Sequence, residues 1–255
     1  MKLTVLGCAG GIGGRERHTT CLRLDDDIFL DAGTGLAQLD VEQLAGINHV
    51  FLTHCHLDHV AGLALLLDAI AGKRAHAVTV HATAKVISSL KKHLFNWILW
   101  PDFATIPNPD NPVLRWEAIE SGEEVTLNGR LIAAHAVNHT TGSVAYSVQK
   151  QESGFLFTGD MCSTPGLWQN VVKEKNLSKI IVDCSFPNEE SDLAAKSMHF
   201  CPKTLIDDVK QVTNQIEFLI YHLKPGQEDA IMAELKMAAG AHQFKALKNL
   251  DEFVF

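Results

Sequence analysis

The 255-residue sequence has no long apolar run and no strongly basic segment. No stretch approaches the ~18 consecutive apolar residues that a transmembrane helix needs, and the apolar start at 3–7 is too short for a signal peptide. The formal net charge of -8 argues against a broad nucleic-acid-binding face, although it is compatible with a local basic pocket for one phosphate. We therefore expect a soluble, cytoplasmic protein.

Two common motifs are also missing. The six cysteines contain no Cys-x-x-Cys pair and no regular framework, which favours reduced thiols. The glycine-rich loop 7–14 lacks the Gly-Lys-Ser/Thr end of a P-loop, and a strand rather than a helix follows it. Two interpretations stay open for the polar residues that follow the loop: they donate hydrogen bonds to a substrate phosphate, or they belong to an ordinary solvated loop. These residues are Arg15, Arg17, His18 and Thr19.

What the sequence does contain is a dense cluster of metal-binding side chains. His54, His56, Asp58 and His59 fall within six residues, directly after the apolar run 49–52, which predicts a buried strand. His54 and His56 lie two residues apart on a segment leaving that strand, so they keep the same side and can bind one ion. Asp58 and His59 are adjacent, need a turn, and suit a second ion. A polar loop rich in histidine is the alternative, but such a cluster would be costly to desolvate without a cation.

Other candidate residues stand at the ends of predicted apolar strands. His139 and His222 each follow such a strand, and Asp160 follows another in Thr-Gly-Asp. A charged aspartate in that position needs a compensating partner, and a metal ion is the simplest one. Asp31 also ends an apolar strand, where it either orients a metal-binding histidine or the metal loop, or caps a turn.

The remaining pattern predicts alternating strands and helices. We expect a β-hairpin over 21–31, helices over about 36–45 and 60–71, and a strand-rich second half. Residues 198–202 are expected in a polar loop, and 227–255 as a helix and a terminal strand.

An aromatic and proline-rich segment covers residues 95–112. Its proline density excludes a regular helix, while Phe95, Trp97, Trp100 and Phe103 need cover. The segment either walls an active site and stacks on a nucleobase, or packs against the fold or a partner subunit.

The order His-x-His-x-Asp-His, a lone His, Gly-Asp and a final strand-end His resembles the metallo-β-lactamase superfamily, from Leu3 to about His222. The resemblance implies an α/β (α+β) fold, a four-layer αβ/βα sandwich of two mixed sheets, as one domain over 1–255. It also implies two divalent metal ions, most often zinc, with manganese or iron as alternatives. The implied ligands are His54, His56 and His139 for one ion and Asp58, His59 and His222 for the other, with Asp160 bridging both.

Within the superfamily, the run His-Cys-His-Leu-Asp-His-Val-Ala-Gly-Leu at 54–63 resembles the class II 3′,5′-cyclic-nucleotide phosphodiesterases. Segments 7–14, 31–35, 198–202 and 221–225 resemble bacterial members as well. The pattern departs from the family signature after Leu63, where that signature continues with aliphatic residues and then Ser with a small residue. The resemblance implies a small-molecule substrate, a cyclic nucleotide such as cAMP or cGMP.

The implied reaction is attack of a metal-bridging hydroxide on phosphorus, with departure of the 3′ oxygen to give the 5′-monophosphate. Asp58 would orient the hydroxide in addition to binding metal. His199 is the candidate general acid, by similarity to the histidine that precedes the last ligand in the related tRNase Z enzymes. An ordinary histidine at a helix start, before Pro202, is the alternative for His199.

Three other functions remain open. Processing of RNA by a tRNase Z-like enzyme uses the same ligands, but the net charge and the lack of a long Lys-rich insertion count against it. Thioester or lactam hydrolysis would direct the same hydroxide to a carbonyl. A non-enzymatic metal-binding or scaffold protein predicts a missing ligand, and none is missing. The sequence does not identify the metal, separate cAMP from cGMP, or fix the number of subunits, with a homodimer left open.

Overall fold

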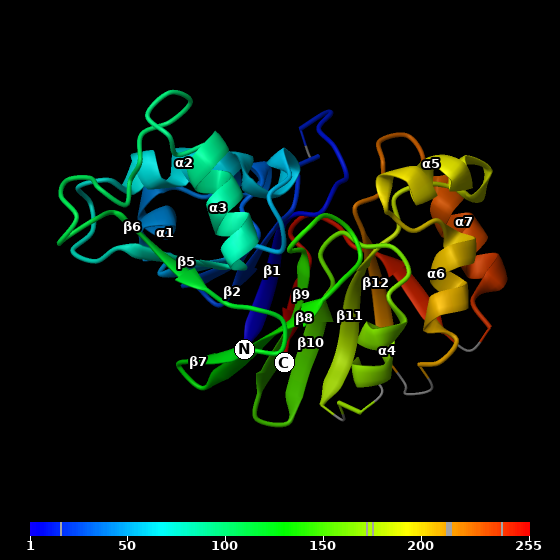
Figure 1. The fold of residues 1–255 in the computed structure, drawn as a ribbon. Helices are drawn as coiled ribbons and strands as arrows, with labels where there is room; N and C mark the ends of the chain where they lie inside the picture. The colour runs from blue at the N-terminus through cyan, green and yellow to red at the C-terminus, as the bar shows by residue number, and fades with distance from the viewer. Residues whose placement is uncertain (16, 172, 175, 213–215, 241) are drawn as a thin grey trace.

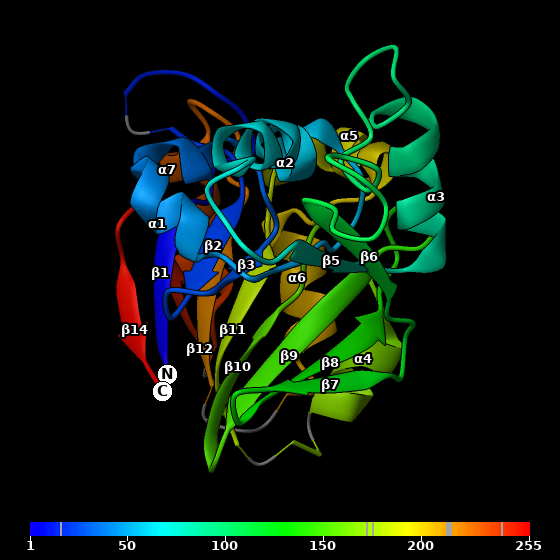
Figure 2. The same cartoon turned by 90° about the vertical axis from the view of Figure 1, so that its left-hand side faces the viewer.

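The computed structural model describes residues 1–15, 17–171, 173–174, 176–212, 216–240 and 242–255. Within these ranges the chain forms two seven-stranded sheets that pack against each other and carry helices on their outer faces (Figure 1 and Figure 2). The predicted four-layer αβ/βα sandwich is therefore confirmed.

The first sheet has the strand order β14-β1-β2-β3-β4-β5-β6. Its strands are β1 (Lys2–Gly7), β2 (Cys21–Leu24), β3 (Ile28–Leu30), β4 (His49–Phe51), β5 (Val78–Ala82), β6 (Leu114–Ala118) and β14 (Glu252–Val254). β2 pairs antiparallel with β1 and β3, which confirms the predicted hairpin, and β3 to β6 run parallel. β14 returns from the end of the chain to pair with β1.

The second sheet has the order β13-β12-β11-β10-β9-β8-β7. Its strands are β7 (Glu124–Leu127), β8 (Arg130–Ala136), β9 (Val144–Lys150), β10 (Ser153–Phe157), β11 (Leu177–Asp183), β12 (Glu217–Tyr221) and β13 (Gln243–Ala246). β7 to β10 pair antiparallel, and β10 to β13 run parallel.

The helices form the two outer layers. α1 to α3 lie over the first sheet and α4 to α7 over the second (Figure 1). They are α1 (Val41–Gly46), α2 (Leu57–Ile70), α3 (Ala84–His93), α4 (Pro165–Val171), α5 (Ser191–Ser197), α6 (Pro202–Val209) and α7 (Glu228–Ala238), with 3-10 turns η1 (Thr34–Gln38) and η2 (Asn188–Glu190). None of the helices in the described ranges combines the length and the apolar character needed to cross a bilayer.

The three large buried apolar cores correspond to the three contacts between the four layers. Successive side chains of a strand point to opposite faces, so Val50 of β4 enters the core under α2, while Phe51 enters the core between the sheets. The third core lies between the second sheet and its helices and contains Phe218 and Trp168. Burial on both faces explains why these strands are almost continuously apolar.

Two predicted helix boundaries were wrong. The helix expected over 36–45 is split into η1 and α1, because Asp40 starts a new helix with a capping box. Its Oδ1 accepts from Gln43 N at 2.8 Å, and the Gln43 side chain accepts from Asp40 N at 3.0 Å. The helix expected from residue 60 begins earlier, at Leu57, so Asp58 and His59 lie in its first turn.

Two further elements were absent from the prediction. The polar segment before residues 198–202 contains α5, which ends at Met198 with a φ of 59°, and the C-terminal segment contains β13 between α7 and β14. Both are short, so periodicity carries little signal for them. Residues 95–112 contain no regular helix, as expected.

Candidate metal centre

The seven candidate ligands come together at one edge of the sandwich. Ligand atoms of His54, His56, His139 and Asp160 lie within 4.8 Å of one another, and so do those of Asp58, His59, Asp160 and His222. Asp160 therefore belongs to both groups. The grouping matches the arrangement that the family resemblance implies.

The candidate ligands lie on segments that follow strands of both sheets. The connection from β4 to α2 carries His54 and His56, and the first turn of α2 carries Asp58 and His59. The other three residues follow the ends of second-sheet strands: His139 follows β8, Asp160 follows β10, and His222 follows β12. The centre thus takes residues from both halves of the chain.

Asp160 lies in the middle of the cluster and is 1% exposed. Its Oδ2 lies 3.7 Å from His54 Nε2 and 3.2 Å from His222 Nε2, and its Oδ1 lies 3.3 Å from His59 Nε2. Tyr221 donates a hydrogen bond to Oδ1 at 2.8 Å. The carboxylate can therefore face two ions while the tyrosine holds its orientation.

Most of the histidines have a fixed ring orientation because Nδ1 is hydrogen-bonded away from the centre. His59 Nδ1 lies 2.6 Å from Asp31 Oδ2, and His139 Nδ1 lies 3.0 Å from the carbonyl oxygen of Met198. His54 Nδ1 contacts Thr53 Oγ1 at 3.0 Å. These contacts leave the Nε2 lone pairs directed at the centre, as in metal-binding histidines generally.

Asp31 occupies the orienting position that the sequence left open against turn capping. Besides the contact to His59, its Oδ1 accepts from Thr53 N and its Oδ2 from Thr53 Oγ1, both at 2.8 Å. Asp31 is fully buried. Its contacts thus support both His59 and the start of the metal loop.

The unpartnered atoms of the cluster test whether metal ions fit here. His54 Nε2, His59 Nε2 and Asp160 Oδ2 are buried and have no hydrogen-bond partner. A buried polar atom without a partner costs about 1–3 kcal/mol, so three side by side require compensation. Imidazole nitrogen and carboxylate oxygen are common ligands of divalent cations such as zinc, so the residues present fit such ions.

The pKa shifts in the group of His54, His56, His139 and Asp160 also favour metal binding. Burial lowers the pKa of His54 well below its usual value, and it lowers the pKa of His56 and His139 as well. All three rings therefore favour the neutral form, which offers a lone pair. Burial opposes the charge of Asp160, but His222 and His59 outweigh it and hold its carboxyl pKa well below the usual range.

His199 lies beside the centre, as its candidate role requires. Its ring centroid is 5.0 Å from those of both His139 and His222, and its Nδ1 lies 2.7 Å from Asp183 Oδ2. Burial alone would lower the pKa of His199, but the Asp183 carboxylate raises it above the usual value. The structure thus brings together an imidazole that is 8% exposed and a fully buried carboxylate.

Sequence reasoning missed Asp183 and Ser185. Ser185 Oγ donates to Asp183 Oδ1 at 2.6 Å and lies 2.8 Å from His222 Nδ1. Ser185 therefore connects the Asp183 carboxylate, which binds His199, to the candidate ligand His222. Asp183 carried the signal that identified Asp160, a charge at the end of an apolar strand. Ligand atoms of Asp183, His199 and His222 also lie within 4.8 Å of one another. Here, however, His199 Nδ1 is already hydrogen-bonded to Asp183 and His222 Nδ1 to Ser185.

The glycine-rich loop is hydrogen-bonded to the backbone of His222 and Leu223. His222 N donates to Cys8 O at 2.8 Å, and Gly10 N donates to Leu223 O at 3.2 Å. A Cβ at Gly10 would lie 2.3 Å from His222 O, so a side chain there would push the two segments apart. The loop therefore acts through close backbone contact.

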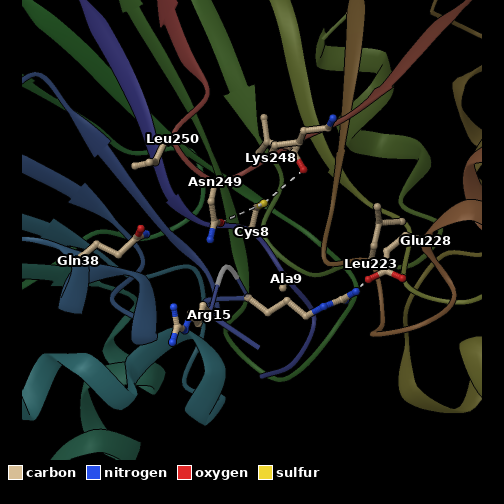
Figure 3. Close-up of a pocket in the computed structure, with 11 residues that line it drawn as sticks. Cys8, Ala9, Arg15, Gln38, Leu223, Glu228, Lys248, Asn249 and Leu250 are labelled. Atoms are coloured by element: carbon tan, nitrogen blue, oxygen red, sulfur yellow. Dashed lines mark hydrogen bonds and ion pairs between the residues drawn. The ribbon is translucent and has the colours of Figure 1, made fainter. Parts of the chain in front are cut away.

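Arg15 lines a cavity of about 470 Å³ together with Cys8 and Asn249 (Figure 3). Arg17 also lines this cavity and forms an ion pair with Glu228. None of the candidate metal ligands lines this cavity. Arg17 is thus already paired with a carboxylate, and phosphate binding by this segment stays a prediction.

The aromatic segment 95–112 divides into two parts. Phe95 and Phe103 are buried in the core under α3, so they pack against the fold. Trp97 is 64% exposed. Packing within the chain therefore accounts for only part of the segment.

Comparison with known proteins assigns the family. Residues 27–231 match the model of the beta-lactamase superfamily domain. The chain therefore belongs to the beta-lactamase superfamily, a fold family whose His and Asp clusters imply divalent metal ions. The resemblance noted in the sequence is confirmed.

Three similar proteins narrow the comparison. The 3′,5′-cyclic-nucleotide phosphodiesterase of Schizosaccharomyces pombe is 28% identical over 64% of this chain and 50% of its own length. The ribonuclease Z of Haloarcula marismortui is 30% identical over 60% of this chain and 48% of its own length. The crystal structure of unliganded yeast PDE1 has a TM-score of 0.82 at 18% identity, covering 100% of this chain and 99% of that one. This chain spans about half the length of both curated relatives.

Proposed function

We propose that this chain is a dimetal phosphodiesterase that opens 3′,5′-cyclic nucleotides, cAMP or cGMP, to 5′-monophosphates. The observation that carries the proposal is a pair of His and Asp clusters that share Asp160 and leave buried ligand atoms without partners. The cyclic-nucleotide substrate is supported by the name of the Schizosaccharomyces pombe relative and by the sequence of residues 54–63.

Two divalent cations, with zinc first and manganese or iron as alternatives, supply positive charge for phosphate oxygens and lower the pKa of water when bound. His54, His56 and His139 would hold one of them, and Asp58, His59 and His222 the other, with Asp160 shared. Tyr221 keeps the Asp160 carboxylate in place by donating to Oδ1.

Asp58 has a second role in this proposal. Its side chain is 29% exposed, whereas the side chain of Asp160 is 1% exposed, so Asp58 is the carboxylate that reaches toward solvent. One oxygen, Oδ2, lies 3.0 Å from His222 Nε2. The other oxygen can accept a hydrogen bond from the attacking water and turn its lone pair toward phosphorus.

His199 supplies the proton for the leaving group. With Nδ1 bound to Asp183, Nε2 is the nitrogen that can donate to the departing 3′ oxygen. The carboxylate beside it raises the pKa of His199 and thereby favours the protonated ring needed for that step. Asp183 is in this scheme a positioning residue that acts through His199.

Hydrolysis assays on the metal-loaded protein test the proposal. Cyclic AMP, cyclic GMP, bis(p-nitrophenyl) phosphate and a thioester are compared with and without a chelator, and chromatography identifies the nucleotide product. We expect chelator-sensitive release of 5′-monophosphates. Cleavage of the generic diester alone would keep the dimetal hydrolase and remove the cyclic-nucleotide substrate, and cleavage of the thioester alone would remove phosphodiester chemistry altogether.

Ribonuclease Z activity is the second candidate, because the Haloarcula marismortui relative is 30% identical. The net charge of -8 opposes it, since RNA docking depends on Lys and Arg contacts to phosphates. A precursor tRNA added to the same assay distinguishes the two. Specific cleavage at the 3′ end of the tRNA, with cyclic nucleotides intact, would replace the first proposal by the second.

A further inference from the structure

Three consecutive apolar side chains project into solvent from the turn that follows α3. Trp97 is 64% exposed, Ile98 92% and Leu99 62%. Figure 2 shows the connection between α3 and β6 projecting beyond the helices, on the same side of the molecule as α2. Isolated exposed apolar residues are ordinary on protein surfaces, but a contiguous group marks an interaction site.

The turn is held rigidly in this exposed position. Asn96 Oδ1 accepts from Ile98 N at 3.0 Å and from Leu99 N at 2.8 Å, and Asn96 Nδ2 donates to Lys92 O at 3.0 Å. Trp97 N donates to Trp100 O at 3.0 Å, although Trp97 has a φ of 63°, which is costly for a bulky residue. The hydrogen bonds of the turn therefore hold these apolar side chains in solvent, even though the backbone at Trp97 is strained.

An apolar hollow lies directly beside the turn. Its volume is about 230 Å³, and its lining includes Leu57, Val60, Leu90, Leu94 and Leu99. Leu57 is itself 71% exposed and begins a stripe on α2 that continues through Ala61 to Leu65, which is 58% exposed. We call Leu57, Ala61, Leu65, Trp97, Ile98 and Leu99 together the apolar face.

We propose that the apolar face binds a second copy of this chain across a two-fold axis, with the turn of each copy seated in the hollow of the other. A two-fold interface brings one surface patch against the same patch, so it requires a protrusion and a recess on one face, and both are present here. The recess is beside the protrusion and lined by the same kind of side chain.

The available area agrees with a stable dimer. Taking roughly 200 Å² for each fully exposed large apolar side chain, the five large residues of the apolar face offer about 700 Å² per copy, close to the ~800 Å² per partner of a standard interface. A membrane surface fits less well, because a net charge of -8 opposes approach to anionic lipid and a flat bilayer leaves the hollow unfilled.

The interface would border the metal centre. Leu57 stands between His56 and Asp58 in the sequence, and it belongs both to the apolar face and to the lining of the hollow. The turn of the partner copy would therefore form part of the wall next to the candidate ligands. This gives Trp97 and its neighbours a role that packing within one chain does not supply.

Sedimentation velocity and light scattering on the full chain test the proposal without any assay of activity. We expect the wild-type protein at micromolar concentration to have twice the 28.0 kDa mass of one chain. Ile98→Glu places a charge in the recess of the partner and should weaken the dimer about 100-fold, the effect of losing one hot-spot side chain. Circular dichroism verifies that the variant is folded.

Met237→Glu is the matched control, because Met237 is 90% exposed on α7, which covers the other sheet. It adds the same charge and should leave the dimer intact. A monomeric wild-type protein, or an Ile98→Glu variant that stays dimeric, overturns the proposal. Binding of the monomeric wild type to vesicles of phosphatidylserine and phosphatidylcholine would instead assign the apolar face to a membrane. Each result holds whether or not the protein cleaves cyclic nucleotides.

Discussion

Asp31 Oδ2 lies 2.6 Å from His59 Nδ1, and both side chains are fully buried. Asp31→Asn replaces the acceptor by an amide that can face His59 with a donor, so His59 loses the hydrogen bond that places the proton on Nδ1 and fixes the orientation of the ring. We expect divalent-metal affinity to fall about 10- to 100-fold, as for other residues that orient metal ligands. Competition against a chelating dye measures it. Asp26→Asn, at a side chain that is 92% exposed, makes the same charge change and should have no effect.

Ser185→Ala tests the link between His222 and Asp183. The hydroxyl lies 2.8 Å from His222 Nδ1, so its loss frees only one of the two ligand groups to change orientation. We expect one of the two metal positions to keep its affinity, and the position that includes His222 to bind its ion about tenfold more weakly. Metal titration followed by elemental analysis measures the stoichiometry. Equal affinity at both positions in the variant would show that the serine does not orient His222.

His199→Ala is expected to separate chemistry from metal binding. Turnover of cyclic AMP should fall about 10²- to 10³-fold in kcat, because the ribose oxygen leaves poorly without a proton. Metal content should be unchanged. Bis(p-nitrophenyl) phosphate should be far less affected, because p-nitrophenolate leaves without protonation. Equal losses of kcat on both substrates would remove His199 as the general acid. Asp183→Asn should lower kcat for cyclic AMP in the same selective way, but by a smaller factor.

The ion pair between Arg130 and Asp27 joins the start of β8 to the turn between β2 and β3. Arg130 is 2% exposed, and its guanidinium contacts the two Asp27 oxygens at 2.6 and 2.7 Å. Arg130→Met should reduce the free energy of unfolding by about 2 kcal/mol, because the aspartates of that turn lose their partner. Urea unfolding measures the change. Lys210→Met, from an exposed pair with Asp207, serves as a control and should leave the midpoint unchanged.

The same pair predicts a pH dependence of stability. Hydrogen bonds from Arg130 lower the pKa of Asp27 in the folded protein. Asp27 therefore stabilises the fold above its unfolded-state pKa of about 3.9, and the contribution is lost as the pH falls toward the folded-state pKa. The difference in unfolding free energy between wild type and Asp27→Asn should be constant from pH 8 to about pH 6 and shrink below about pH 5. A difference that grows on acidification would contradict this sign.

Metal removal should lower thermal stability as well as activity. The buried Asp160 carboxylate and its histidine neighbours include ligand atoms without other partners, so a bound ion stabilises the folded state by mass action. We expect a chelator to lower the Tm of the wild type and to lower the Tm of His54→Ala by clearly less, because that variant has already lost one of the two ions. Calorimetry with and without the chelator measures both. An identical chelator shift in the two proteins would argue against His54 as a ligand.

The sequence was informative where chemistry is local. His54, His56, Asp58 and His59 are contiguous, so their density alone predicts a metal site, and the two sheets follow from apolar strands. Asp31, Thr53 and Ser185 support the site from separate strand ends, and no spacing in the sequence reveals which partner each one meets. The break at Asp40 follows from a capping box that includes Gln43, whereas α5 is too short for a periodic signal. That residues 1–255 form one domain stays a prediction.

Both candidate metal positions draw ligands from the two halves of the sandwich. Separation of the first sheet from the second would therefore require breaking bonds to the ions, because His54 and His59 lie in one half and His139 and His222 in the other. Bound ions would therefore link the two sheets, so removal of the ions with a chelator should speed the global hydrogen exchange of both halves.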